Sequence, residues 1–280
     1  MKILVTGANG QLGHELTALA IPGIEIVGVS RTEMDVTDQD QTFAVIQAVQ
    51  PDAVIHAAAF TGVDLAESQP DDAYRVNATG TRNVAVATER VGARLCYVST
   101  DYIFNGMGSK PYGEYDNTDP QSVYGKSKRA GEMLVQSLHS RWFIVRTSWV
   151  YGEHGTNFVK TMLQKSSELR KMRVVDDQVG SPTYVKDLAE LLIDMVRTEK
   201  YGIYHASNTG TCSWYEFARE IFDVTGTTTV LEPCSTEEFP RPAPRPRYSV
   251  FEHTALRTNG FALLRPWREA LNDFLGGLKV

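Results

Sequence analysis

The first half of the chain alternates short apolar runs with longer segments in which apolar residues recur at helical spacing. Runs rich in Val, Ile and Leu predict buried strands, and the segments between them predict helices. The predicted strands cover residues 2–6, 25–29, 53–56, 94–99 and 142–147. Strands that alternate with helices form parallel sheets with right-handed crossovers. We therefore predict an α/β fold with a doubly wound, Rossmann-like parallel sheet.

Beyond residue 149 this alternation becomes irregular. Helical segments near 157–170, 185–197 and 213–226 are separated by short apolar runs and by turns rich in Gly and Pro. We predict a dinucleotide-binding domain over residues 1–149 and a smaller C-terminal α/β lobe, mainly substrate-binding, over residues 150–280. Elements from about residues 172–198 are expected to return to the first domain.

The first predicted strand ends in a glycine-rich turn, Gly7-Ala-Asn-Gly10-Gln11-Leu12-Gly13, which opens a predicted helix. The first glycine permits a tight turn, the second lets the backbone approach a pyrophosphate, and the third lets helix and strand pack closely. The spacing differs from the G-x-G-x-x-G of conventional dinucleotide-binding dehydrogenases, and a purely structural turn is the alternative. We predict that these five numbered residues bind a dinucleotide.

The end of the second strand bears on the choice of cofactor. Ser30 and Arg31 stand where an Asp or Glu would hold the ribose 2′-hydroxyl of NAD, whereas an Arg there suits the 2′-phosphate of NADP. NADPH is therefore favoured over NADH, the alternative being a surface arginine. Asp35 and Val36 follow, and they offer an acidic and an apolar side chain to the adenine ring.

Small residues follow the third strand. Because open α/β sheets bind ligands at the carboxyl ends of their strands, small side chains there keep the backbone accessible to a cofactor. We predict that four residues line this part of the site: Ala57, Ala58, Ala59 and Thr61. His56, at the end of the same strand, is interpreted as structural.

A Tyr-x-x-x-Lys pair, Tyr124 and Lys128, lies on a helix predicted over about 122–139. Side chains four apart share one face of a helix, and a nearby cation favours the ionised form of a phenol, whose pKa is ordinarily ~10. The pair can therefore transfer a proton, although the pattern alone also fits a solvated helix face. Strand ends of a parallel sheet lie along one edge, so we expect the glycine turn, Thr100 after the fourth strand, and Tyr124 at one crevice.

Composition and charge narrow the choice of partner. The 280 residues carry a formal net charge of −6, without the concentrated Lys and Arg that nucleic acid requires. No apolar run approaches the ~18 residues needed to cross a bilayer. The chain begins directly with a strand, so we expect a cytoplasmic protein. Three widely spaced cysteines suggest neither disulfides nor a zinc site.

Several motifs in matching order resemble the extended, nucleotide-sugar-modifying branch of the short-chain dehydrogenase/reductase superfamily, and within it the dTDP-4-dehydrorhamnose reductase family. The resemblance covers nearly the whole chain. The motifs are Gly10-Gln-Leu-Gly13, Ser99-Thr-Asp-Tyr-Ile-Phe104, Tyr124-Gly-Lys-Ser-Lys128, Arg146-Thr-Ser-Trp-Val-Tyr151, Asn157-Phe-Val-Lys-Thr-Met162 and Asp177-Gln-Val-Gly-Ser-Pro-Thr183. The resemblance implies NAD(P)H-dependent reduction of the C4 ketone of dTDP-4-dehydro-β-L-rhamnose to dTDP-L-rhamnose, the last step in making that sugar donor.

The resemblance also assigns roles to single residues. Thr100, Tyr124 and Lys128 form the catalytic set, and Tyr124 and Lys128 also contact the cofactor. Tyr124 would protonate the C4 oxygen, Thr100 would hydrogen-bond the same oxygen, and Lys128 would lower the phenol's pKa and hold the nicotinamide ribose. Four residues are implied as substrate contacts: Asp101, Trp149, Val63 and Asn157. An indole such as Trp149 is equally suited to the core.

Two arginines and one carboxylate are further candidates for ligand binding. Arg245 and Arg247 lie on a proline-stiffened segment and suit the substrate's diphosphate, since a guanidinium donates bidentately. A basic surface linker is the alternative. Some members of the family hold Mg²⁺ at a dimer contact, which makes a homodimer an expectation and Glu15 a weak candidate ligand. One carboxylate does not define a metal site, and we assign none.

Two other functions are compatible with the sequence. One is a nucleotide-sugar epimerase that retains its NAD. The other is a non-catalytic, nucleotide-sensing regulatory subunit, because the resemblance extends to a regulator of methionine adenosyltransferase. Sugar dehydratases of the branch place a Glu after the catalytic Asp, whereas Tyr102 follows Asp101 here. That difference argues against dehydration, and the intact catalytic set favours an enzyme.

Overall fold

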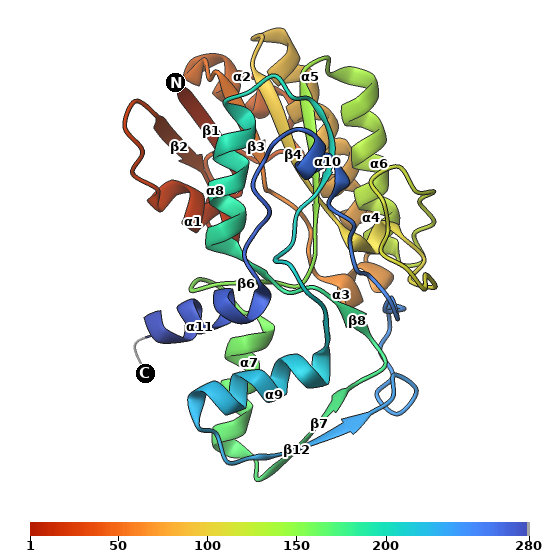
Figure 1. Ribbon diagram of the computed structural model, residues 1–280. Coiled ribbons are helices and arrows are strands. Elements are labelled where there is room, and N and C mark those ends of the chain that lie inside the picture. Colours follow the sequence, from red (N-terminus) through yellow and green to blue (C-terminus); the bar gives the residue numbers. More distant parts are fainter. Residues whose placement is uncertain (279–280) are drawn as a thin grey trace.

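The computed structural model, which describes residues 1–278, has two lobes (Figure 1). Within these residues the upper lobe contains a six-stranded sheet in the order β10-β5-β4-β3-β1-β2, with every neighbouring pair parallel. The strands are β1 Lys2–Thr6, β2 Glu25–Val29, β3 Ala53–His56, β4 Arg94–Thr100, β5 Trp142–Thr147 and β10 Gly202–His205. The predicted doubly wound sheet and its five strands are confirmed, and β10 is an edge strand that the sequence pattern did not reveal.

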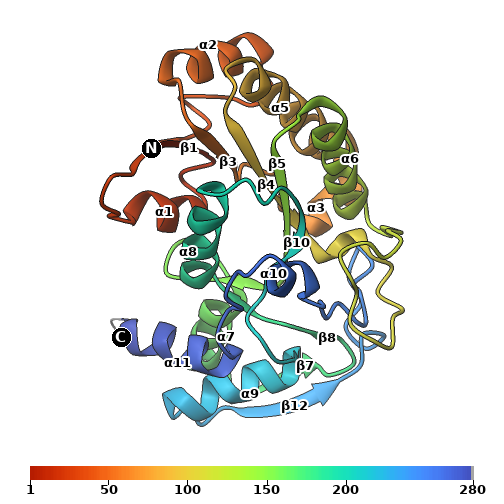
Figure 2. The same ribbon diagram turned by 45° about the horizontal axis from the view of Figure 1, so that its top comes forward.

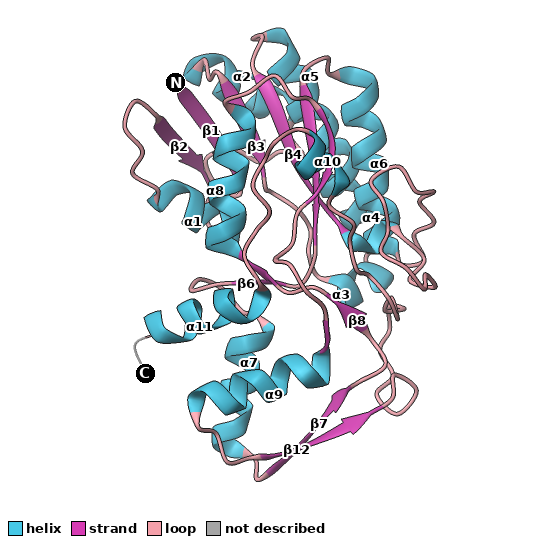
Figure 3. Cartoon of the chain, in the orientation of Figure 1, coloured by secondary structure: helices cyan, strands magenta, loops and turns pink. Residues whose placement is uncertain are grey.

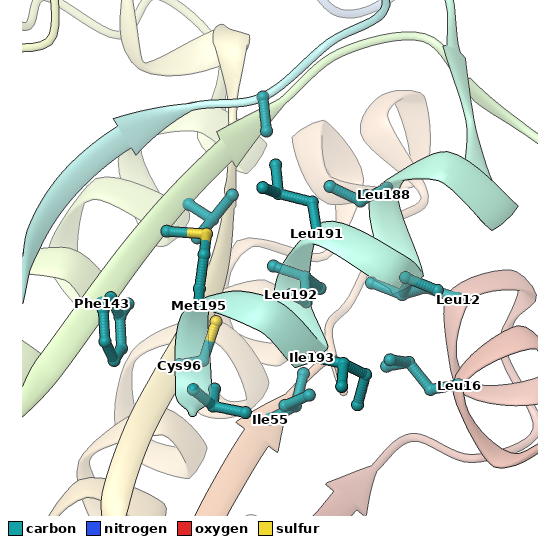
Figure 4. Packing of buried hydrophobic residues seen from close by; sticks show 14 of the residues in the cluster. Leu12, Leu16, Ile55, Cys96, Phe143, Leu188, Leu191, Leu192, Ile193 and Met195 are labelled. Atoms are coloured by element: carbon teal, nitrogen blue, oxygen red, sulfur yellow. The ribbon is translucent and has the colours of Figure 1, made fainter. Parts of the chain in front are cut away.

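Alternating residues of the strands contribute to two apolar cores, one on each face of the sheet. Helices lie on both faces of the sheet (Figure 2). Ile3 and Val5 point to one face and Leu4 to the other. The first face is covered by α1 Gln11–Ala18, α8 Val185–Val196 and α10 Thr254–Thr258; the second by α2 Gln39–Val49, α5 Thr81–Arg90 and α6 Val123–Leu138. Figure 4 shows leucines of α8 facing Ile55 and Cys96 of the sheet. Burial on both faces is the usual arrangement of a parallel sheet.

A long helix between β3 and β4 changes its hydrogen-bonding register midway. It runs through α4 Pro70–Tyr74, the π-helical turn η1 Arg75–Gly80, and α5. The helical stretch from Pro70 to Arg90 is therefore not a uniform α-helix. π-Turns occur often at functional sites, and this one contains the buried side chain of Asn77. Two short helices flank the same region: α3 Val63–Ser68 and the 3₁₀ turn η2 Asp101–Ile103.

The lower lobe combines helices with short strands (Figure 3), and it has a separate aromatic-rich core. Phe217, Trp267 and Phe274 are buried there. Its elements are α7 Phe158–Glu168, α9 Trp214–Thr225, α11 Trp267–Gly277, and the paired strands β7 Lys171–Val175 with β12 Val230–Cys234, β6 Val150–Tyr151 with β9 Thr183–Tyr184, and β8 Val179–Gly180 with β11 Cys212–Ser213. From the interval 172–198, α8 packs on the main sheet while β7 belongs to the lower lobe. The boundary at residue 149 stays a prediction.

None of the helices described for residues 1–278 has both the length and the apolar character that crossing a bilayer requires.

Candidate active site

The parallel sheet brings three strand ends to one edge. β3 lies between β1 and β4 in register, so the turn after β1, the small residues after β3 and Thr100 at the end of β4 are neighbours. Helix α6 packs against β4 and η2 beside them. As expected from the sequence, these segments lie together at the carboxyl edge of the sheet.

The glycine turn is shaped by backbone contacts that exclude side chains. Gly7 has φ +72°, and a Cβ there would lie 2.8 Å from the backbone of Ala58. A Cβ on Gly13 would lie 2.2 Å from the carbonyl oxygen of Gly7. Gly10 begins α1 without a side-chain cap, which leaves the helix N-terminus suited to a phosphate group. These close approaches fit a dinucleotide's pyrophosphate.

The side chains of the two residues between Gly10 and Gly13 have different surroundings. Leu12 is buried in the core, so its side chain does not face the turn. Gln11 is half-buried, and its Oε1 accepts a hydrogen bond of 3.1 Å from Nδ2 of Asn157 in the lower lobe. The cofactor turn is therefore tied directly to the lobe that would bind substrate.

The end of β2 contains a carboxylate that the sequence reasoning missed. Glu33 Oε2 accepts from the backbone nitrogen of Ser30 at 2.8 Å and from its hydroxyl at 2.7 Å. The Ser30 hydroxyl bond, followed by the Ser30 backbone bond, lowers the pKa of Glu33. Arg31 is 80% exposed and lies 3.4 Å from Asp35. An arginine and a carboxylate thus stand together where the adenosine ribose would bind.

Asp35 and Val36 are less available to a ligand than we expected. Asp35 Oδ1 accepts from the backbone nitrogen and hydroxyl of Thr37 at 2.9 and 2.8 Å. The Val36 side chain is buried against Gly80, where an added Cβ would lie 2.7 Å from it. Both side chains chiefly hold the loop after β2.

The segment after β3 is fixed by hydrogen bonds to its backbone. Thr6 Oγ1 accepts from the nitrogen of Ala58 at 3.2 Å. Asn77, in the π-turn, accepts from the nitrogen of Phe60 at 2.8 Å and donates to its oxygen at 3.1 Å. Its Nδ2 also donates to Ser127, between Tyr124 and Lys128, at 2.9 Å. Asn77 thus joins the segment with Ala57, Ala59 and Thr61 to α6.

Helix α6 starts at a well-defined point. The Ser122 side chain accepts from the nitrogen of Gly125, and Glu67 of α3 accepts from the nitrogen of Val123 at 2.8 Å. A Cβ on Gly125 would lie 2.2 Å from the carbonyl oxygen of Tyr102, so the helix approaches η2 closely. These contacts place Tyr124 next to the end of β4.

Tyr124 has the environment of a proton donor. Burial raises the pKa of its phenol to about 12, a hydrogen bond with Thr100 opposes that rise, and the charge of Asp101 adds to it. Thr100 Oγ1 in turn donates to Asp101 Oδ1 at 3.0 Å and accepts from the nitrogen of Tyr102 at 3.2 Å. The phenol is therefore protonated at neutral pH, and its hydroxyl is oriented by Thr100.

Lys128 is held by contacts with β4, and its expected lowering of the pKa of Tyr124 stays a prediction. Its Nζ donates to the carbonyl oxygen of Val98 at 2.7 Å and lies 4.0 Å from the ring centroid of Tyr97. Burial lowers the pKa of the ammonium to about 7, against the opposing charge of Glu132. The spacing places both residues on α6, but the contacts of Lys128 come from β4. Lys126, by contrast, is exposed.

The residues implied as substrate contacts line both lobes. Asp101 is buried, and its burial raises the pKa of the carboxyl to about 6, although hydrogen bonds from Ser249 and Thr100 oppose the shift. Val63 is half-buried at the first turn of α3. Asn157 caps α7 through its Oδ1, and its Nδ2 donates to Gln11 and to the oxygen of Gly152. Its amide is thus committed to internal hydrogen bonds.

Trp149 packs on another tryptophan. Its ring lies 3.5 Å from that of Trp214, with only 9° between the planes, and it is half-buried. A Cβ on Gly180 would lie 2.7 Å from the indole. The backbone of Trp149 has φ +49°, a left-handed conformation that costs a non-glycine residue of order 1–3 kcal/mol and clusters at functional sites. One face of the indole is therefore covered by the lower lobe.

The two late arginines have different surroundings. Arg245 Nη2 lies 2.9 Å from Asp64 Oδ1 of α3, and its guanidinium is 5.9 Å from the Tyr102 ring centroid. Arg247 is exposed and pairs with Glu237 at 3.5 Å. Arg245 therefore reaches the crevice, and Asp64, which the sequence reasoning overlooked, holds it there.

Glu15, on α1, is half-buried, and its burial raises the pKa of its carboxyl. Lys186 and Glu190 of α8 are among its charged neighbours. Across residues 1–278, no group of three or more His, Cys, Asp or Glu side chains is arranged to hold a metal ion.

A Rossmann-like sheet with a Tyr-x-x-x-Lys helix at its carboxyl edge defines the short-chain dehydrogenase/reductase class of protein. The family model described as the RmlD substrate binding domain matches residues 1–280. The chain belongs to this family.

Individual relatives cover nearly the same length. The chain is 47% identical to the spore coat polysaccharide biosynthesis protein SpsK of Bacillus subtilis, over 98% of this chain and 96% of that one. It is 39% identical to dTDP-4-dehydrorhamnose reductase of Aggregatibacter actinomycetemcomitans, over 97% of each chain. The crystal structure of dTDP-4-dehydrorhamnose reductase from Bacillus anthracis in complex with NADP is similar with a TM-score of 0.97 and 47% identity, over 99% of each chain.

Proposed function

We propose that this protein uses NADPH to reduce the C4 ketone of dTDP-4-dehydro-β-L-rhamnose, giving dTDP-L-rhamnose. The observation that carries the proposal is the Tyr124 hydroxyl, which is protonated at neutral pH, close to Thr100, and located at the sheet edge where the glycine turn opens. Membership of the family over the full chain supports the substrate. The NADP complex of a 47% identical relative supports the cofactor.

Reduction of a ketone adds hydride to carbon and a proton to oxygen. NADPH, when bound, supplies the hydride. As negative charge develops on the carbonyl oxygen, Tyr124 donates its proton to that oxygen as a general acid. Thr100 lies beside the phenol, and its hydroxyl, which donates to Asp101 in this structure, would turn to donate to the same oxygen. The ammonium of Lys128 would favour the phenolate that remains and would hold the nicotinamide ribose when the cofactor is bound.

The substrate would lie between the lobes. Asp101 suits a sugar hydroxyl, because a buried carboxylate accepts strong hydrogen bonds. The indole of Trp149, stacked on Trp214, offers its remaining apolar surface to the sugar. Arg245 suits the diphosphate and is already oriented by Asp64, and Arg247 is placed further out. Val63 and Asn157 complete this proposed set, with Asn157 acting chiefly through the position of α7.

The proposal is tested with freshly made dTDP-4-dehydrorhamnose. Purified protein should oxidise NADPH only when this sugar is present. Tyr124→Phe should lower the rate at least ~10²-fold, since it removes the general acid, while NADPH binding measured by fluorescence stays within about twofold. No NADPH consumption by the wild-type protein with the keto sugar would contradict the proposal and would favour a regulatory subunit. NAD that stays bound through purification would favour an epimerase.

A further inference from the structure

A buried ion pair lies directly behind the Tyr124–Lys128 pair. Glu132 of α6 and Arg146 of β5 are both buried. Arg146 Nε donates to Glu132 Oε1 and Nη2 to Oε2, each at 2.9 Å, which is a bidentate arrangement. Ser99 of β4 donates to Oε1 at 2.6 Å, and Arg129 lies 3.3 Å from Oε2. The Glu132 carboxylate is thus held from β4, β5 and its own helix.

Glu132 is one helical turn after Lys128, on the same face of α6. The groups around the Lys128 ammonium come from several elements. The Tyr97 ring and the Val98 carbonyl come from β4, and His56, whose pKa the Lys128 charge helps to lower, comes from β3. Burial keeps His56 uncharged, with a pKa of about 3. Among the described residues, Glu132 is the carboxylate whose charge opposes the effect of burial on Lys128.

Arg146 connects the same carboxylate to the long loop between β4 and α6. Its Nη1 donates to the carbonyl oxygen of Glu114 at 2.8 Å and lies 3.3 Å from Nε2 of His205 on β10. The guanidinium is 5.4 Å from the Phe104 ring centroid. The helix that carries Tyr124 is therefore joined to this loop and to two strands through one buried pair.

We propose that Glu132, clamped by Arg146 and Ser99, is a positioning residue for the reaction, because it fixes the turn of α6 that carries Lys128 and balances the charge of the buried ammonium. The inference rests on the proposed function, which gives Lys128 a role only while it is charged. A buried ion pair is weak evidence that the pair stabilises the fold. A negative charge one turn from Lys128, however, favours the charged form of that lysine. Glu132 touches neither substrate nor cofactor in this assignment.

The test is a titration of Lys128 in the full-length protein. Protein labelled with ¹³C at the lysine Cε is titrated by NMR, and Lys128→Met assigns the signal. Glu132→Gln should lower the midpoint of Lys128 by about one pH unit or more, because a nearby carboxylate favours the charged amine. Glu132→Asp keeps the negative charge, so the titration midpoint of Lys128 should lie much closer to its wild-type value. Glu114→Gln is the matched control, since Glu114 is also buried beside Arg146 and its carboxylate instead accepts from the nitrogen of Ala255.

The kcat/KM of the reduction should change in parallel with the fraction of Lys128 that is charged. At pH 7.5, Glu132→Gln should lower kcat/KM roughly tenfold, and the loss should shrink toward pH 6 as Lys128 becomes charged again. If Glu132→Gln does not fold because Arg146 is left unpaired, Glu132→Gln/Arg146→Gln removes both charges and should lower the midpoint in the same direction. An unchanged midpoint in a folded variant would overturn the inference. The titration needs no keto sugar, so a wild-type protein that fails to reduce the sugar overturns the proposed function alone.

Discussion

The buried side chain of Asp101 lowers the stability of the folded protein when its carboxyl is charged. The carboxyl is 2% exposed, and burial raises its pKa from an ordinary 3.8 to about 6. The folded state therefore holds its proton more tightly than the unfolded state between about pH 4 and pH 6. Stability falls as the pH rises through that window, and the cost is fully present above it. Groups whose pKa is strongly shifted by burial often belong to functional sites, and Asp101 lies next to Thr100 of the proposed catalytic set.

We predict that Asp101→Asn stabilises the protein at pH 7.5 by roughly 2–3 kcal/mol, since a shift of about two pKa units corresponds to about that free energy. Near pH 3 the gain should disappear, because the wild-type carboxyl is mostly protonated there in both states. Urea unfolding of both proteins at the two pH values measures the difference. A gain that is equal at both values would contradict the assignment. Turnover of the keto sugar should fall in the variant.

Arg31 and Glu33 are predicted to affect cofactor choice in opposite directions. Arg31→Ala should raise the KM for NADPH roughly 10- to 100-fold, the worth of a charge-assisted hydrogen bond to the 2′-phosphate, and leave the KM for NADH nearly unchanged. Glu33→Gln, which removes a negative charge beside the same phosphate, should lower the KM for NADPH. Steady-state kinetics with both cofactors gives the ratio. Equal effects of Arg31→Ala on the two KM values would show that this arginine does not read the 2′-phosphate.

At the scale of elements, the glycine turn depends on close packing of α1 onto the strand end. Gly13 and Gly7 allow approaches that a methyl group would block. Gly10 leaves the N-terminus of α1 without a side-chain cap. The turn therefore gives up local helix stabilisation and presents backbone N–H groups to a phosphate.

We predict that Gly13→Ala lowers cofactor affinity more than tenfold, because its Cβ would lie 2.2 Å from the oxygen of Gly7 and would force the turn open. Gly276→Ala in α11 is the matched control. No atom lies within 4 Å of its added Cβ, so this change should stabilise the protein by about 0.5–1 kcal/mol. Fluorescence titration with NADPH and thermal unfolding separate the two effects. Unchanged affinity in Gly13→Ala would show that the turn does not hold the cofactor.

At the scale of the whole molecule, the lobes are joined by polar contacts near the proposed cofactor site. Asn157 of the lower lobe bonds Gln11 at the start of α1. Arg265 reaches Asp187 of α8 at 2.9 and 3.0 Å, and Asn208 donates to the same carboxylate at 2.7 Å. Such contacts fix the position of the lower lobe relative to the glycine turn and α8.

The bridge at Asn157 can be separated from its capping role. Asn157→Ser keeps a side chain that caps α7, so unfolding should change little, whereas Asn157→Ala should cost about 1 kcal/mol more. Both variants lose the bond to Gln11, and both should weaken NADPH binding about two- to tenfold. Urea unfolding and NADPH titration of the two variants test this. If only Asn157→Ala binds NADPH more weakly, the effect comes from the cap and not from the bridge.

Much of this protein follows from patterns that act over a few residues. The strand runs, the glycine spacing and the separation of Tyr124 from Lys128 determined the sheet, the turn and the helix face, because secondary structure and its side-chain directions repeat over short distances. Parallel strand ends also brought Thr100 to the same edge as the glycine turn.

The environments of these residues were decided only by the tertiary structure. Lys128 donates to Val98, Trp149 stacks on Trp214, and Asp64 orients Arg245. Burial and charge at a site come from segments far apart in the chain, so no local pattern contains them. For this reason the sequence determined which segments lie at the carboxyl edge of the sheet, whereas the packing of α6 on β4 and β5 determined how readily Tyr124 and Lys128 hold a proton.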